Sequence, residues 1–442
     1  MLKRLPLLIA VIALAVGLGN FIVKNFLAAS LIAYGDTDAS RDLAADYAPS
    51  NPLVIAARGK YLLYRAEPSR PEEAVAELQR AVVASPRDYR FWLELGRAYE
   101  SVGEVARAEK ALQRAVELAP RYFETRWTMA NFRLRTGKTE ASLDDFREAI
   151  ILSGRDAARP DEQATLNVYG AIAGALGANL EALQRVTPTN NGAQAHLTGF
   201  LATHGAPASL DVAIDLWRRL PMGDEASYRR ASFQLIRELQ GRGCFTDARE
   251  VWDGIERLAS ADGALVVTSQ QTNLMTNAGF ERAPISERFT EFADSLTGFD
   301  WIIGRHAEVR ARRTDSEKHG GAYSLQLTFA ASMRSGFQEV SQIVAVEPAQ
   351  GYRLSYFVKT RNVPSDAPFV EIADAIEPAS FALRSVVPGG TNDWNGQSIA
   401  FTIPASTRGL RLTIRGPQIA AIDPTRIAEV WLDDFKLEKT GQ

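Results

Sequence analysis

A spacing of 34 residues between residues that end helices is the feature that most constrains the fold of this chain. Pro86 and Pro120 are 34 residues apart, and Gly154 follows Pro120 at the same distance. Between Pro86 and Pro120, apolar and small residues recur at helical spacing on two successive segments: Trp92, Leu95, Gly96 and Tyr99, then Ala108, Leu112 and Ala115. Small residues at Gly96 and Ala108 allow two antiparallel helices to approach closely. The spacing therefore predicts a series of helix pairs.

The segment FWLELGRAYESVGEVARAEKALQRAVELAP resembles the tetratricopeptide repeat, a 34-residue pattern of the form W-x2-LG-x2-Y…G…A-x3-F-x2-A…P. The next copy keeps Met129, Ala130, Gly137, Phe146 and Ala149. The preceding copy keeps Ala74, Leu78, Ala81 and Pro86, with a three-residue insertion in its turn, AEPSRP. The resemblance implies a solenoid that stacks helix pairs and exposes a concave surface for protein segments.

The repeat decays after Gly154 but does not vanish. Two weaker copies keep the spacing of the second helix: Ala213, Trp217 and Leu220, then Ala248, Trp252 and Ile255. The segment 155–190 is expected to be helical without clear periodicity, and Pro160 and Pro188 interrupt it. We expect a helical solenoid over 37–262, with clear repeats over about 52–156.

The resemblance also implies which residues face the groove of the solenoid. They lie on the first helix of each pair and point away from the packing seam. Arg90 and Arg97 of the best copy, and Trp127 and Asn131 of the next, are the candidate protein-binding residues. Trp127 could instead pack on the neighbouring repeat, and the arginines could belong to a merely solvated face.

An apolar run from Leu5 to Val23 follows Lys3 and Arg4. As a helix it is about 28 Å long, which matches the hydrocarbon core of a bilayer. The preceding positive charge places the N-terminus in the cytoplasm and the remaining chain outside. We expect residues 1–33 to be a single-pass anchor in a bacterial cytoplasmic membrane. A cleaved signal peptide, with a site at Ala13-Leu14-Ala15, is the alternative and would give a secreted protein.

The hydrophobic period changes to two near NLMTNAGFERA, which begins at Asn273. Seven segments alternate from there: EVRARRT, YSLQLTF, QEVSQIVAVE, YRLSYFVKT, SIAFTIP, LRLTIRG and EVWLDDFKLEK. Turn-forming sequences such as HGG and PGGTND separate them. Short strands at this spacing predict a β-sandwich over 265–442. The fold class is therefore multidomain: a transmembrane helix, an all-α solenoid and an all-β jelly-roll sandwich.

This region resembles carbohydrate-binding modules of the family 4/9/22 type. The resemblance rests on N-x-GFE at Asn277 to Glu281, on HGGAYSL from His319, on Gln342 before IVAVEPAQGYRLSYFVK, and on the closing WLDDFKLEK. It implies one structural Ca²⁺, held by Glu281 and Asp433 with Asp434 as the alternate ligand, because carboxylate oxygens are preferred ligands of this ion. The two carboxylates could instead cap strands or pair with basic groups.

The resemblance also makes a sugar ligand an expectation, although many modules with this fold bind no sugar. Exposed aromatic side chains form sugar platforms, so Trp301 and Trp394 are candidates, and both could equally be core residues. Arg310 and Arg312 lie on one side of a predicted strand and could meet an anionic polysaccharide. A solvated edge strand is the alternative for these arginines.

Composition and motifs argue against other classes of function. The net charge of −3 gives no overall attraction to nucleic acid. One cysteine, Cys244, and four scattered histidines form no Cys-based or HExxH metal site. No GxSxG, P-loop or facing pair of catalytic carboxylates is placed on a plausible element, so we expect no enzyme.

The sequence therefore predicts a membrane-anchored, extracytoplasmic adaptor. Its solenoid binds a protein partner, and its sandwich binds a polysaccharide. By architecture it resembles accessory proteins of envelope or exopolysaccharide production. The alternative is a scaffold that binds only proteins, with a sandwich that has no sugar site.

Overall fold

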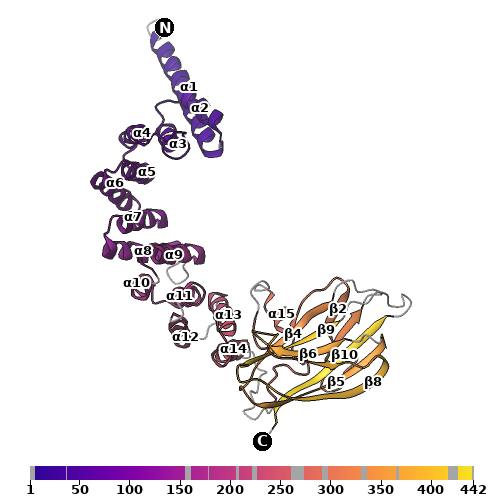
Figure 1. The fold of residues 1–442 in the computed structure, drawn as a ribbon. Helices are drawn as coiled ribbons and strands as arrows, with labels where there is room; N and C mark the ends of the chain where they lie inside the picture. The colour runs from indigo at the N-terminus through magenta and orange to yellow at the C-terminus, as the bar shows by residue number, and fades with distance from the viewer. Residues whose placement is uncertain are drawn as a thin grey trace. The chain divides into compact units, whose positions relative to one another are not determined.

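The structure, a computed structural model of the chain, describes residues 5–35, 37–154, 161–177, 179–205, 209–221, 226–259, 273–290, 297–329, 336–364, 368–416 and 427–440. The chain divides into two compact units, Met1–Ala193 and Gln194–Gln442. The first unit is helical, and the second contains helices and two β-sheets (Figure 1). The predicted fold class is confirmed in both its helical and its β part. The domain boundary predicted at 262–265 lies outside the described residues.

Helix α1 (Leu5–Tyr34) joins the apolar N-terminal segment to the repeats without interruption. Its stretch Ala13–Tyr34 is long and apolar enough to cross a membrane, and little of it is buried. Its last turns pack on α2 (Asp38–Tyr47), and Asn51 Nδ2 donates to Asn25 Oδ1 at 3.1 Å. This contact contains Ala28, Leu31, Ile32, Ala44, Ala48 and Val54.

Six helices after α2 form three pairs that correspond to the three clear repeats. In two of these pairs, a glycine of the first helix allows the second helix to approach closely. A Cβ on Gly96 would lie 2.5 Å from Leu112 Cδ2, and one on Gly59 would lie 2.7 Å from Leu78 Cγ. Gly103, in the turn of the second pair, has a φ of 79°, which glycine adopts without strain. The helices are α3 (Pro52–Tyr64), α4 (Pro71–Ala84), α5 (Tyr89–Ser101), α6 (Val105–Leu118), α7 (Phe123–Arg135) and α8 (Thr139–Ser153).

Less regular helices follow. Helix α9 (Glu162–Leu176) begins at Asp161, whose carboxylate accepts the N–H of Ala164 at 2.8 Å, and α10 is Leu180–Val186. Helix α11 (Asn191–His204) crosses the division between the two units. The second helices of the two degenerate copies are α12 (Ser209–Arg219) and α14 (Phe245–Ala259), and α13 (Ala226–Gly241) lies between them in the chain. A short helix, α15 (Ile285–Arg288), precedes the strands.

Within the described residues, ten strands form two antiparallel sheets of five strands each. The first sheet has the order β1-β4-β9-β6-β7, and the second has the order β2-β3-β10-β5-β8. All seven predicted strands are present, whereas β1, β6 and β7 were not predicted. The strands are β1 (Ile302–Ile303), β2 (Val309–Thr314), β3 (Ser324–Phe329), β4 (Phe337–Ala345), β5 (Gly351–Val363), β6 (Phe369–Asp374), β7 (Ala382–Val386), β8 (Gly390–Thr402), β9 (Gly409–Gly416) and β10 (Ala428–Lys439).

Alternate residues of the strands meet between the sheets in one core, which includes Leu325, Leu354, Leu412 and Leu432. The stretch that begins at Asn273 forms no strand, but it is bonded to β10. Leu274 N–H donates to Leu437 O at 2.9 Å, and Phe435 N–H donates to Ala278 O at 3.0 Å. The change of period in the sequence therefore marks the point where the chain enters the sandwich.

Helix α14 packs on the outer face of the first sheet. A Cβ on Gly409 of β9 would lie 2.4 Å from the ring of Phe245, and one on Gly298 would lie 2.3 Å from Trp252. Gln240 of α13 extends this contact, because Thr297 Oγ1 donates to Gln240 Oε1 at 2.6 Å. The last helix pair and the sandwich therefore share buried surface within the second unit.

Four charged side chains lie beside this contact. Glu256 of α14 pairs with Arg282 and, at 2.8 Å, with Arg288. Arg288 Nη2 lies 2.6 Å from Asp300 Oδ2, and the Asp300 carboxylate is fully buried. Burial raises the pKa of Asp300 to about 6, although Arg288 opposes the shift.

Candidate functional site

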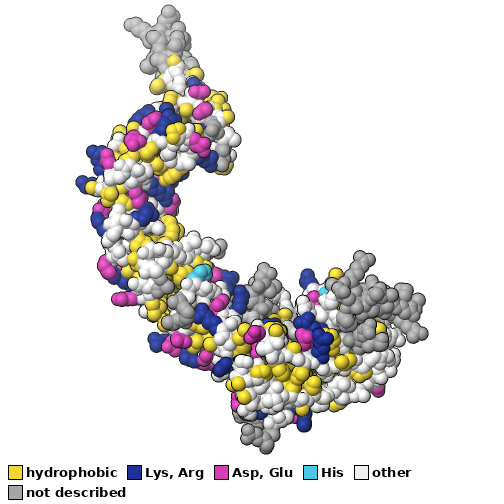
Figure 2. Space-filling view, in the orientation of Figure 1, with side chains coloured by type: hydrophobic (Ala, Val, Ile, Leu, Met, Phe, Trp, Pro, Cys, Tyr) yellow, Lys and Arg dark blue, Asp and Glu magenta, His cyan; other side chains and the backbone are white. Residues whose placement is uncertain are grey.

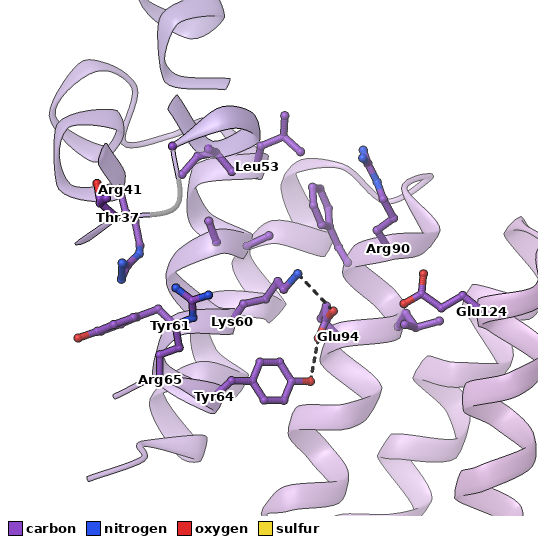
Figure 3. Close-up of a pocket in the computed structure, with 16 residues that line it drawn as sticks. Thr37, Arg41, Leu53, Lys60, Tyr61, Tyr64, Arg65, Arg90, Glu94 and Glu124 are labelled. Atoms are coloured by element: carbon purple, nitrogen blue, oxygen red, sulfur yellow. Dashed lines mark hydrogen bonds and ion pairs between the residues drawn. The ribbon is translucent and has the colours of Figure 1, made fainter. Parts of the chain in front are cut away.

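A groove in the first unit is lined by α3, α5 and α7, the first helices of the three clear repeats. Its first pocket, of about 420 Å³, lies between these helices and the segment that joins α1 to α2. Its second pocket, of about 590 Å³, shares Tyr64 with the first. In the first pocket Lys60 and Tyr64 extend from α3 toward Glu94 of α5, between Arg41 on one side and Arg90 on the other (Figure 3).

Glu94 occupies the middle of the first pocket and is buried. Tyr64 Oη donates to Glu94 Oε2 at 3.0 Å, while Lys60 Nζ lies 3.7 Å and Arg97 Nη1 lies 3.2 Å from Glu94 Oε1. Burial, together with the nearby Glu94 carboxylate, raises the pKa of the Tyr64 hydroxyl, so Tyr64 remains a donor at neutral pH. Because a buried carboxylate is costly unless it is paired, these partners hold Glu94 in place.

All four residues predicted to face the groove line these pockets: Arg90 in the first, and Arg97, Trp127 and Asn131 in the second. Trp127 is half-buried and stacks on Phe123, with ring centroids 5.9 Å apart. It also meets the ring of Phe146 edge-on at 5.7 Å. Trp127 thus packs on its neighbours and also lines the pocket. That these residues bind a protein remains a prediction.

Arg97 also joins two repeats. Its Nη2 donates to Thr128 Oγ1 of α7 at 2.9 Å and lies 3.5 Å from Glu124 Oε1, while its Nη1 pairs with Glu94 of its own helix. Replacement of Arg97 by glutamate would gather three carboxylates at one point. Such a variant would therefore disturb the packing of α5 on α7 and would be a poor test of partner binding.

The outer face of the second sheet carries a chain of hydrogen-bonded side chains from four adjacent strands. Arg312 Nε of β2 donates to Gln326 Oε1 of β3 at 2.9 Å. Gln326 Nε2 donates to Glu429 Oε1 of β10 at 2.8 Å, and Arg361 Nη1 of β5 donates to Glu429 Oε2 at 2.8 Å. Guanidinium, amide and carboxylate groups offer donors and acceptors in fixed directions, as recognition of a polyhydroxyl ligand requires.

Trp431 lies within this polar chain, on the central strand β10. The strand register places it between Gln326 and Lys359, and the guanidinium of Arg361 lies 5.0 Å from its ring. The side chain is 2 % exposed, and its indole N–H has no hydrogen-bond partner among the described residues. Trp431 is thus buried beneath the hydrogen-bonding side chains and supports them from below.

A second aromatic group lies on the same sheet, near the start of β3. The ring of His319 stacks on Phe357 with centroids 3.5 Å apart, and Trp394 meets His319 edge-on at 5.8 Å. Gly396 of β8 lies against the ring of Phe357, since a Cβ there would be in van der Waals contact with it at 3.4 Å. This part of the sheet therefore presents aromatic surface beside polar side chains.

The four predicted sugar-binding residues differ in their exposure to solvent. The prediction for Trp301 is wrong: it is fully buried, with ring centroids 5.0 Å from Phe280 and 5.1 Å from Phe435, so it belongs to the core. Trp394 is only half-buried, on β8. Arg310 and Arg312 are exposed on β2 and alternate with inward-facing residues, which places them on the open face.

The two predicted calcium ligands converge on the loop 319–323, where backbone N–H groups of the loop donate hydrogen bonds to their carboxylates. Asp433 Oδ2 accepts the N–H of His319 at 2.9 Å and of Gly320 at 3.1 Å. Glu281 accepts the N–H of Ala322 at 3.0 Å. Among the described residues, no group of three or more His, Cys, Asp and Glu side chains could hold a metal ion. The two carboxylates therefore anchor the loop through its N–H groups. That Glu281 and Asp433 also hold a calcium ion, whose shell would include backbone carbonyl oxygens, remains a prediction.

Replacement of Asp433 by alanine is expected to lower the free energy of unfolding by about 1–3 kcal/mol, because two N–H groups lose a buried acceptor. Asp433→Asn keeps an acceptor oxygen and should lose less. Thermal unfolding of the full chain, with and without EDTA, measures both effects, and an unchanged wild-type Tm on chelation would leave loop anchoring as the role of the two carboxylates. A fall in Tm with EDTA that calcium restores would instead establish a metal site.

The comparisons with known proteins agree with the helical geometry. Residues 66–129 match the family model described as tetratricopeptide repeat. Over these residues the helical array is similar to the tetratricopeptide repeat (TPR). Human superkiller complex protein 3 is 32% identical over 88 residues, which are 20% of this chain and 6% of the human protein. The chain therefore corresponds to a small part of that relative's length.

Solved structures with similar folds include two carbohydrate-binding modules. One belongs to family 61, in complex with β-1,4-galactotriose: it is 20% identical, with a TM-score of 0.26, over 38% of this chain and 99% of that chain. One of family 4 is 16% identical, with a TM-score of 0.27, over 38% and 99%. The MamA protein is 17% identical, with a TM-score of 0.29, over 38% and 90%. At these identities the likeness concerns the fold alone.

Sequence reasoning missed Glu94, Tyr64 and Trp431. The TPR period contains a signal for Glu94, because Lys60, Glu94 and Thr128 stand one 34-residue period apart on successive first helices. The alternation in AEVWLDDF contains a signal for Trp431, which stands between the inward residues Val430 and Leu432. Both positions are thus readable from the sequence once the period of each region is known.

Proposed function

We propose that this protein is a membrane-anchored, extracytoplasmic adaptor whose TPR groove binds a protein and whose sandwich binds a glycan. The observation that carries the glycan part is the open face of the second sheet, where a polar chain from β2 to β5 lies over the buried ring of Trp431 and the half-buried Trp394 lies beside His319 on the same sheet. Helix α14 packs on the outer face of the first sheet and covers part of it.

The anchor is supported by the way α1 is built. Cleavage after Ala15 would leave the second half of α1 attached to the repeats, because Ala28, Leu31 and Ile32 pack on α2 and α3. That remnant would expose a row of large apolar side chains to water: Val16, Leu18, Phe21, Ile22 and Val23. A lipid environment around an uncleaved helix accounts for them better, and Lys3 and Arg4 orient it with the N-terminus inside.

An adaptor of this layout suits envelope or exopolysaccharide production, in which the TPR groove would hold a protein of the pathway while the sandwich holds the polymer. The second candidate, a scaffold that binds only proteins, is favoured by one observation. The polar side chains of the open sheet already satisfy one another, as Glu429 does with Gln326 and Arg361. A glycan would have to replace some of these bonds.

A glycan array with the full chain in detergent tests the proposal. The full chain is needed because Trp252 and Phe245 of α14 bury part of the sandwich. We expect selective binding that Trp431→Ala or Gln326→Ala weakens about tenfold, which corresponds to about 1.4 kcal/mol. Arg384→Ala, an exposed change on the first sheet, is the control and should bind as wild type.

Thermal unfolding of each variant shows whether a lost signal reflects the site or the fold. A blank array from folded wild-type protein would reject the glycan part and favour the protein-only scaffold. Equal loss in Arg384→Ala and Gln326→Ala would show that the binding surface lies elsewhere on the sandwich.

A further inference from the structure

We propose that the TPR groove binds an acidic, extended segment adjoining a transmembrane helix of another membrane protein. This deepens the protein-binding part of the proposed function and rests on its membrane anchor. The two pockets are lined by six cationic and three acidic side chains, and Arg90 is also paired with Asp88 beside the first pocket, so two positive charges remain in surplus in a chain of net charge −3. The charged lining residues are Arg41, Lys60, Arg65, Arg90, Arg97, Arg135, Glu94, Glu100 and Glu124.

The acidic side chains of the groove already form ion pairs with cationic side chains of the same groove. Glu94 is held by three partners, and Glu100 accepts two bonds from Arg135, at 2.8 and 2.9 Å. Charges of both signs lie side by side over these repeats (Figure 2). An arginine has five N–H donors, so Arg135 keeps donors after it has bound Glu100. A carboxylate of a partner can therefore be accepted without displacing the internal pairs.

The apolar side chains of the groove indicate an extended chain as the occupant. Leu53, Phe91 and Leu93 line the first pocket, and Trp127 lines the second. Leu93 and Trp127 are one 34-residue period apart, so an apolar residue recurs at this position of successive first helices, next to the cationic side chains. An extended segment that carries both acidic and apolar residues matches this lining, whereas a single phosphate-bearing headgroup would fill one pocket only.

The position of the first pocket places the occupant near the membrane. Ile32, Gly35 and Thr37, at the end of α1 and just after it, line that pocket. Ile32 follows Lys24, the first charged residue after the apolar run, by eight residues. At 1.5 Å per residue, the pocket begins about 12 Å along the helix from the end of the apolar run. A segment of a partner protein would therefore reach the first pocket within a few residues of leaving the bilayer.

The charge requirement is tested with the full chain in nanodiscs and two fluorescent twelve-residue peptides, one alternating Glu with Leu and the other alternating Lys with Leu. Fluorescence anisotropy should show binding of the Glu–Leu peptide alone, weakened by salt. Arg65→Glu, which reverses an exposed charge in the first pocket, should weaken binding at least tenfold. Lys110→Glu, on the exposed side of α6 and outside both pockets, should stay within twofold.

Equal binding of both peptides, or no loss in Arg65→Glu, would overturn the proposal. A phospholipid source of negative charge is separated by lipid composition, with nanodiscs of phosphatidylcholine alone compared with nanodiscs containing phosphatidylglycerol. Binding of the Glu–Leu peptide in phosphatidylcholine supports a peptide site. If phosphatidylglycerol abolishes binding of the Glu–Leu peptide to the wild-type chain, the groove is a lipid site and the proposal fails.

The membrane-proximal position is tested with a synthetic Leu–Ala transmembrane helix in the same nanodisc, followed by the Glu–Leu segment either directly or after twenty Gly–Ser residues. A photo-crosslinking residue in place of Tyr61 should capture the direct probe more efficiently than the spaced one. Stronger capture of the spaced probe would overturn the juxtamembrane assignment. Glycan binding does not involve Arg65, and extraction of the chain from membranes by carbonate tests the anchor separately, so failure of the proposed function would be recognised independently.

Discussion

Replacement of Arg288 by methionine is expected to lower the free energy of unfolding by about 3–5 kcal/mol at pH 7, because it removes one partner of a buried ion pair. The substitution leaves the fully buried Asp300 carboxylate without the guanidinium that lies 2.6 Å away. Glu256 retains Arg282 as a partner. Urea unfolding of the full chain, followed by tryptophan fluorescence, measures the loss, since Trp252 and Trp301 are buried near this network.

The loss should shrink as the pH falls, and this dependence distinguishes a charge effect from a packing effect. Burial raises the pKa of Asp300 to about 6 in the folded protein, above about 3.9 in an unfolded chain. The folded state therefore holds the proton more tightly, so the contribution of Asp300 to stability is complete below about pH 4 and is lost as the pH rises through about 6. Without Arg288 this pKa rises further.

At pH 5 the Asp300 carboxyl is mostly neutral, so removal of Arg288 should cost less there than at pH 7. The control is the double variant Arg288→Met/Asp300→Asn, which buries no unpaired charge and should show little pH dependence between 5 and 7. Equal losses at the two pH values in Arg288→Met would contradict the assignment of Asp300 as the responsible group.

The regular repeats could be predicted because their contacts are local and recur with a fixed period. Gly96 meets Leu112 across one turn, and Gly59 meets Leu78 in the preceding pair. The contact of α14 with the sandwich has no such period: Trp252 meets Gly298, 46 residues later, and Phe245 meets Gly409. Periodicity identifies an element's inward face but not its distant partner, so the sharing of one compact unit by the last repeat and the sandwich could not be read from the sequence.

The candidate sites also divide into residues that a repeated pattern predicts and residues whose partners lie far away in the sequence. The groove residues were predictable, since Arg90, Arg97, Trp127 and Asn131 occupy repeated positions of the first helices. Trp301 precedes a strand of two residues, which is too short for alternation to show which way it points. For Glu281 and Asp433 the residue types were compatible with calcium. The backbone N–H groups that bind them belong to a loop whose conformation leaves no residue pattern.

Replacement of Gly96 by leucine is expected to lower the stability of the α5–α6 pair by about 1–3 kcal/mol, the usual cost of overpacking a filled contact. A Cβ at this position would lie 2.5 and 2.6 Å from two carbon atoms of Leu112 and 3.3 Å from Ala108 O. Leu112 is itself 1 % exposed and lies in the core of the repeats, so it has little room to move. Hydrogen exchange of α5 and α6, together with circular dichroism of the full chain on heating, measures the local and the global loss.

Gly174→Leu in α9 is the matched control, because this helical glycine has no neighbouring atom within 4 Å of a Cβ. Leucine also has a higher helix propensity than glycine, by up to about 1 kcal/mol. The control should therefore be neutral or stabilising, while the same chemical change at Gly96 destabilises. If both variants melted as wild type, the close approach of α5 and α6 at Gly96 would be wrong, and the spacing of 34 residues would need another structural cause.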